Sequence, residues 1–199
     1  MSVRNIYPAS LRVIQDEHEH LYSVIQGMRY FVRQIESGGN APDLKVFRAM
    51  LYYIMEYPEK VHHPKEDHYL FAKIKERTHQ LDTELDALSE QHSKGELMAH
   101  RLFHALLDYE FGGEPAFLPF RDLVEQYAHF YFTHMRAEEE HIMPVARQVL
   151  NNLDWKEVDT AFLENKRMLD DAGERYKYEQ LFSLIVNISP APIGVADPI

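Results

Sequence analysis

The chain has 199 residues, a formal net charge of −11, 12 histidines and no cysteine. The missing cysteine excludes disulfides, iron–sulfur clusters, cysteine-ligated zinc and a thiol nucleophile. The acidity argues against a nucleic-acid partner, because phosphate contacts need clustered lysine and arginine. Histidine is the commonest metal ligand, so the positions of the 12 histidines become the first question.

Four long helices are predicted over residues 10–36, 43–76, 81–111 and 116–150. Apolar residues recur three and four positions apart in these segments, as in the series Leu11, Ile14, Leu21 and Ile25, and no useful stretch alternates with period two. Asp43 is placed to cap the second helix. Long helices with short connections are antiparallel neighbours, so we expect an all-α, antiparallel up-down four-helix bundle.

Two short C-terminal helices are expected after the bundle, near residues 155–162 and 174–187. We therefore divide the chain into a bundle over residues 1–152 and a helical extension and tail over residues 153–199, packed on the bundle. The aromatic residues of this extension also offer a surface for a homodimer. The first residues lack the features of a secretory signal. No apolar stretch approaches the roughly 20 residues that span a bilayer, which predicts a cytoplasmic protein without membrane contact.

Each of the four apolar stripes is interrupted by a histidine that the helical spacing directs inward. In chain order these histidines are His18, His62, His92 and His134. A glutamate follows one turn after two of them, namely Glu66 and Glu138. Four imidazoles and two carboxylates facing one core would be very costly unless they were paired or bound to metal. Their coincidence predicts a metal site.

The spacing also suggests how such a site is built. His62-x-x-x-Glu66 and His134-x-x-x-Glu138 each place both side chains on one helical face, about 5–6 Å apart at Cβ. A glutamate can bridge two ions while the histidine on its helix binds one of them. Two bridging carboxylates suit ions roughly 3.5–4 Å apart. The histidines of the other two helices add terminal nitrogen ligands.

These residues resemble a known family. His18, the run His62-His-Pro-Lys-Glu66, the run Gln91-His92-Ser-Lys-Gly95 and the run His134-Met-Arg-Ala-Glu138 are similar to the hemerythrin-like (HHE cation-binding) domain over residues 10–150. The end of the chain resembles a tail of bacterial members. The resemblance implies a four-helix bundle around a non-haem di-iron centre with oxo-type and carboxylate bridges. It implies these metal ligands: His18, His62, Glu66, His92, His134 and Glu138.

The sequence departs from the oxygen carriers of that family, which have five terminal histidines, including a His-x-x-x-His pair on the third helix. Here the residue four positions after His92 is Glu96. Further candidate ligands are therefore His63, Glu96 and His141. Pro58 and Pro64 predict a bend in the second helix, because proline removes an intrahelical hydrogen bond.

A set dominated by histidine favours a di-iron protein that binds or senses dioxygen, or handles iron, over an enzyme. Manganese and zinc are possible substitutes for the two iron ions. The alternative is a di-iron protein that acts on peroxide or nitric oxide, or repairs iron centres. In either case the expected partner is dioxygen or another small diatomic or peroxide ligand.

Two other functions remain open. Glu59-x-x-His62 and Glu138-x-x-His141 supply the paired motifs of a ferritin-like carboxylate oxidase. That class also needs an inward glutamate from each remaining helix, and the first helix offers none on its apolar stripe. A metal-free acidic interaction bundle is the last alternative, which metal analysis would distinguish.

Overall fold

The computed structural model describes residues 7–171 and 174–195, with side chains described outside residues 164–179. In chain order the helices are α1 (Ala9–Glu36), α2 (Leu44–Tyr57), the π-helix η1 (Pro58–His62), α3 (His63–Lys65), the π-helix η2 (Glu66–Phe71), α4 (Ala72–Arg77), α5 (Asp82–Gly112), the 3₁₀-helix η3 (Glu114–Ala116), α6 (Phe117–Ala137), the π-helix η4 (Glu138–Ile142), α7 (Met143–Val149), α8 (Asn152–Asp171) and α9 (Glu174–Ile188). The all-α prediction is confirmed.

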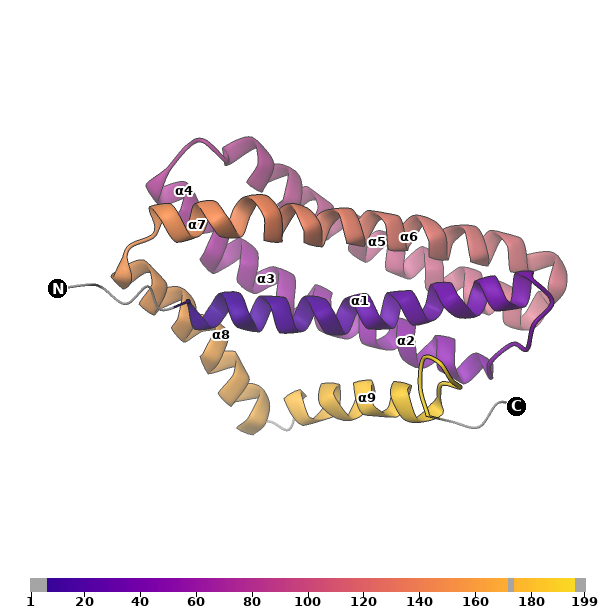
Figure 1. Cartoon of the computed structure of the whole chain (residues 1–199). Helices are drawn as coiled ribbons and strands as arrows, with labels where there is room; N and C mark the ends of the chain where they lie inside the picture. Colours follow the sequence, from indigo (N-terminus) through magenta and orange to yellow (C-terminus); the bar gives the residue numbers. More distant parts are fainter. Residues whose placement is uncertain (1–6, 172–173, 196–199) are drawn as a thin grey trace.

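Long helical rods packed against one another form the body of the molecule (Figure 1). Rod 1 is α1, rod 2 runs from α2 to α4, rod 3 is α5 and rod 4 runs from α6 to α7. Rod 1 packs against rods 2 and 4, and rod 3 packs against the same two rods. The ends of all four rods lie within one residue of the predicted ends. Asp43 caps rod 2 as expected, since its side chain accepts a 2.9 Å hydrogen bond from the Lys45 amide.

The C-terminal helices lie against the rods. Helix α8 contacts α1 and η2, and α9 contacts α2 (Figure 1). Asp159 on α8 accepts hydrogen bonds from the backbone N–H and the hydroxyl of Ser10, at 2.8 and 2.6 Å, and so caps the start of rod 1. Arg77 at the end of rod 2 forms a two-bond ion pair with Asp154. Helix α8 is longer than the helix predicted near residues 155–162, and the division at residue 152 stays a prediction.

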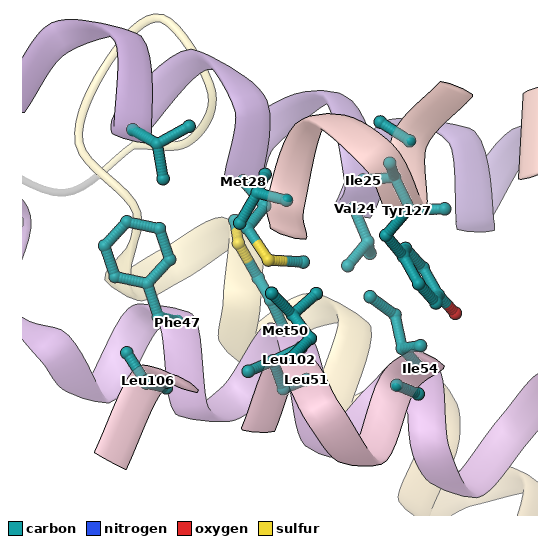
Figure 2. Packing of buried hydrophobic residues seen from close by; sticks show 14 of the residues in the cluster. Val24, Ile25, Met28, Phe47, Met50, Leu51, Ile54, Leu102, Leu106 and Tyr127 are labelled. Atoms are coloured by element: carbon teal, nitrogen blue, oxygen red, sulfur yellow. The ribbon is translucent and has the colours of Figure 1, made fainter. Parts of the chain in front are cut away.

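The apolar core forms two clusters. The first contains Phe47 and Met50 of α2 with Leu102 of α5, and Figure 2 shows these side chains packed among those of α1. The second contains Ile14 of α1 and Leu85 of α5. Along each rod, the polar positions singled out above fall between members of these two clusters. The core is therefore a polar layer bracketed by two apolar layers.

Rods 2 and 4 are widened where they cross the polar layer. The His63 N–H bonds to the Pro58 carbonyl and the Met143 N–H bonds to the Glu138 carbonyl, five residues back instead of four. Both donors directly precede a proline, Pro64 or Pro144. A proline ring lacks an N–H and clashes with the carbonyl four residues back, and a π-turn relieves that clash. In rod 2 the widened turn thus directly precedes Pro64.

None of the helices in the described ranges combines the length and the apolar character needed to cross a bilayer.

Candidate metal centre

Seven side chains gather in the polar layer, at least one from every rod. They are His18 of α1, His62 of η1, His63 of α3, Glu66 of η2, His92 of α5, His134 of α6 and Glu138 of η4. Each is buried, and the most exposed of them, His92, has only 5 % of its surface in contact with solvent. A buried set of this kind needs either internal partners or bound metal.

The seven side chains divide into two adjacent groups that share carboxylates. Ligand atoms of His18, His62 and Glu66 lie within 4.8 Å of one another. Glu66 also belongs to a second group with His92, His134 and Glu138. His63 joins this second group, because its ligand atom lies within 4.8 Å of those of His92 and His134. The two oxygens of Glu138 lie 3.3 Å from His18 Nε2 and 3.4 Å from His134 Nε2. Both glutamates therefore reach both groups, as two neighbouring cations require.

All five histidines are held from outside through Nδ1. The bonds run from His18 to Glu139 at 2.8 Å, His62 to Glu17 at 2.6 Å, His63 to Glu59 at 3.1 Å, His92 to Asp67 at 2.9 Å and His134 to Gln91 at 3.0 Å. Since these acceptors are carboxylate or amide oxygens, each Nδ1 is the donor. An outer acceptor of this kind fixes the ring orientation and makes Nε2 the metal-binding nitrogen.

Four of these outer bonds join neighbouring rods in a closed cycle. Glu17 of rod 1 holds the histidine of rod 2, and Asp67 of rod 2 holds the histidine of rod 3. Gln91 of rod 3 holds the histidine of rod 4, and Glu139 of rod 4 holds the histidine of rod 1. Each of the four acceptors is the chain neighbour of a residue in the cluster. The same short motifs thus supply the inner groups and their outer supports.

Five inner atoms of the cluster lack hydrogen-bond partners among the described residues, whereas His18 Nε2 and His62 Nε2 lie 3.1 Å apart and pair with each other. Within the described part of the chain, His92 Nε2, His134 Nε2, Glu66 Oε2 and both oxygens of Glu138 are buried without a hydrogen bond. Each such atom costs about 1–3 kcal/mol when left unsatisfied. Nitrogen and carboxylate oxygen are also the donor types that divalent iron, manganese and zinc accept. The residues present therefore fit bound metal cations.

The charges in the layer are balanced unevenly. Burial raises the pKa of Glu66 well above its usual range, and the charge of Glu138 adds to this effect. Burial acts the same way on Glu138, but the surrounding imidazoles, first that of His134, outweigh it and hold its pKa well below the usual range. Burial also opposes charge on His18, yet contacts with Glu138 and Glu139 raise its pKa to about 10. Protons on imidazole thus supply positive charge that a metal cation would replace.

His63 is held by a second buried chain of contacts. Its partner Glu59 also accepts a 2.5 Å hydrogen bond from the hydroxyl of Tyr131, which comes from rod 4. Burial raises the pKa of Glu59 to about 7. Tyr131 crosses rod 3 at Gly95, where an added Cβ would lie 2.3 Å from the phenol oxygen. This close approach explains why a glycine stands on the apolar stripe of rod 3.

The structure brings together seven of the nine candidate ligands named from the sequence. Glu96 and His141 are exposed and lie outside the groups. The six remaining histidines are also exposed: His20, His68, His79, His100, His104 and His129. Sequence reasoning missed all five outer acceptors. The signal for four of them was a polar residue directly beside an inward histidine or glutamate.

A helical bundle with a buried, shared histidine and carboxylate cluster defines a class of metal-binding proteins. Comparison with protein families agrees with this class, because the hemerythrin HHE cation binding domain profile matches residues 9–146. The chain belongs to this family. Searches among curated proteins and among solved structures found no significant match.

Proposed function

We propose that the protein holds two iron ions in a non-haem di-iron centre that binds or senses dioxygen, or handles iron. Five histidines and two glutamates would hold the ions. His63, His92 and His134 would hold one ion and His18 and His62 the other, and Glu66 and Glu138 lie within reach of both groups. The observation that carries this proposal is the set of buried, inward-facing nitrogen and oxygen atoms without hydrogen bonds.

Histidine outnumbers carboxylate in this set by five to two. Neutral imidazoles leave a di-iron pair less electron-rich than carboxylates do, which favours reversible binding over cleavage of dioxygen. When bound, the irons supply the reversible electron exchange that holds a small diatomic ligand. The protein's own part is to orient the five rings through their outer acceptors and to exclude water with the apolar layers above and below.

The proposal extends to the arrangement of the rods and to the setting of the protein. Rods that follow one another in the chain pack together through short connections, which supports an antiparallel up-down bundle. We also propose a cytoplasmic setting and, through the aromatic C-terminal extension, assembly into a homodimer.

Catalysis on peroxide or nitric oxide is the second candidate, and one contact favours it. Glu59 and Tyr131 form a buried proton donor–acceptor pair one hydrogen bond from His63. A carboxyl group whose pKa is about 7 can hold or release a proton near neutrality. The ferritin-like alternative finds no such support, because His141 is exposed.

Anaerobic loading with ferrous iron followed by exposure to air separates these functions. For the oxygen-binding function we expect an absorption band that appears with dioxygen, disappears on degassing and returns over several cycles without net dioxygen consumption. Continuous consumption of dioxygen or peroxide would favour the enzyme. If the protein failed to retain iron, the metal-free interaction bundle would be the remaining alternative. Glu96→Ala alters an exposed candidate ligand on the same helix as His92. Because Glu96 lies outside the cluster, this variant should bind iron and dioxygen as the unaltered protein does.

A further inference from the structure

A surface cavity of about 510 Å³ lies between rod 1 and rod 4, and His18 is one of its lining residues. Glu19 and Tyr22 of α1 line one side, and Arg136 and Glu139 line the other. His18 is only 3 % exposed and is the most buried residue of the lining, so we call it the floor of the cavity, and it is also one of the proposed metal ligands. The cavity therefore joins the solvent to the edge of the polar layer.

The cavity is lined by both partners of the hydrogen bond between His18 and Glu139, which has the most exposed acceptor of the four bonds that join the rods in a cycle. The side chain of Glu139, which holds His18, is 39 % exposed, whereas that of Asp67 is 29 % exposed and that of Glu17 is 11 % exposed. A hydrogen bond to an exposed carboxylate competes with water and contributes little to stability. Three histidines are held by carboxylates from neighbouring rods. Among them, His18 has the hydrogen bond that is most easily broken, because its partner Glu139 is the most exposed.

The lining of the cavity favours cations. It contains the exposed carboxylates of Glu19, Glu139 and Glu140 against one guanidinium, that of Arg136. A cleft lined with charge of one sign, next to low-dielectric walls, raises the local concentration of counter-ions and their rate of association. The rings of Tyr22 and Phe132, whose centroids are 4.7 Å apart, supply such a wall.

The histidine at the floor of the cavity also lies beside an unsatisfied ligand atom. Glu138 Oε2 is buried, lacks a hydrogen bond among the described residues and lies 3.3 Å from His18 Nε2. A cation that displaces the contact between Glu139 and His18 would meet this carboxylate next. The acidic lining, the exposed support and the unsatisfied oxygen thus lie in sequence from solvent to centre.

We propose that this cavity is the uptake route for divalent cations, with the Glu139–His18 pair as its gate. Glu19 and Glu140 attract the ion, Glu139 exchanges its bond to the His18 Nδ1–H for contact with the ion, and the released imidazole turns to admit it. No covalent step is involved. This inference rests on the proposed function, since it supplies the centre described above.

The test follows the uptake of cobalt(II) by the metal-free, full-length protein in a stopped-flow spectrometer. The Glu19→Gln/Glu140→Gln variant removes two charges from the cavity and no proposed ligand. We expect its second-order uptake rate to fall roughly threefold to tenfold at low salt, with the difference shrinking as salt is added. The final cobalt content should be unchanged.

The matched control removes the same number of charges elsewhere. Asp108→Asn/Glu114→Gln alters two exposed acids at the far end of the bundle and should leave the rate unchanged. If the two double variants take up cobalt at the same rate, the proposed uptake route is wrong, but the proposed metal centre is not contradicted. If the unaltered protein takes up no cobalt, the proposed function and the route both fail.

A second variant tests the route by size instead of charge. Ser23 is an exposed lining residue, so Ser23→Trp should obstruct the cavity and slow uptake at any salt concentration. Ser93→Trp places the same bulk on the exposed face of α5 and should not slow it. Slower uptake in Ser93→Trp alone would overturn the proposed route.

Discussion

The two unbroken rods and the two widened rods contribute differently to the centre. Helices α1 and α5 are regular over 28 and 31 residues, and each supplies one histidine to the cluster. Rod 2 contains two π-helices and supplies His62, His63 and Glu66, and rod 4 contains one and supplies His134 and Glu138. The π-turns therefore mark the places where a rod contributes more than one group.

The difference has a geometric reason. On a regular α-helix, residues that share a face are three or four positions apart, so adjacent residues point in different directions. A π-turn adds a residue to the turn and commonly occurs at functional sites. His62 and His63 are both buried in the cluster although they are consecutive. The proline that follows them is what the wider turn accommodates.

If the widened turns position the extra ligands, the largest effect of a substitution is expected at Pro64. Pro64→Ala restores the missing N–H donor and should allow a regular turn, which would stabilise the metal-free protein by up to about 3 kcal/mol. The same change should turn His63 away from its neighbours and weaken metal binding about 10–100-fold. Thermal unfolding of the metal-free protein and competition with a chelator measure the two effects.

Pro119→Ala is the matched control for this substitution. Pro119 lies exposed in the first turn of α6, where the N–H has no intrahelical partner, so both quantities should change little. Unchanged metal affinity in Pro64→Ala would show that the widened turn does not position His63.

Sequence periodicity predicted the regular rods better than the widened ones. Breaks in the sequence such as Ser37-Gly-Gly and Phe111-Gly-Gly located the rod ends, and the apolar spacing located the four stripe histidines, because those features depend on one helix at a time. It offered His63 only as an added candidate, since a regular helix turns one of two adjacent residues away from the core. The position of Glu17 and Asp67 beside inward residues did not reveal which histidine each supports, because that depends on which rods are neighbours in space.

A smaller effect is expected where rod 4 crosses rod 3. Gly95→Ala places a methyl group 2.3 Å from the Tyr131 oxygen, so the phenol must move away from Glu59. Overpacking of this kind costs about 1–3 kcal/mol of unfolding free energy. Denaturant unfolding checks the size of the loss.

Gly112→Ala gives the contrasting result within the same helix. Its added Cβ would meet only the Ala116 side chain, at an ordinary 3.6 Å, so the helix should gain up to about 1 kcal/mol. Equal changes in stability at the two glycines would contradict the close crossing at Gly95.

The smallest effect concerns the point where the C-terminal extension touches the start of rod 1, which is one of the unbroken rods. Asp159→Ala removes the cap that α8 supplies to Ser10 and should cost about 1 kcal/mol of unfolding free energy. Metal content should not change. Asp16→Ala, at an exposed site on the same rod, should leave both the unfolding free energy and the metal content unaltered. A loss of metal in Asp159→Ala would mean that the extension helps to shape the centre.

The most direct test of the shared centre is the iron content of Glu66→Ala after anaerobic loading and removal of free metal. Glu66 lies in both ligand groups, so the unaltered protein should retain about two irons per chain and the variant fewer than about one. Circular dichroism would verify that the variant keeps its helices. Retention of about two irons by Glu66→Ala would contradict a centre in which this carboxylate bridges both ions.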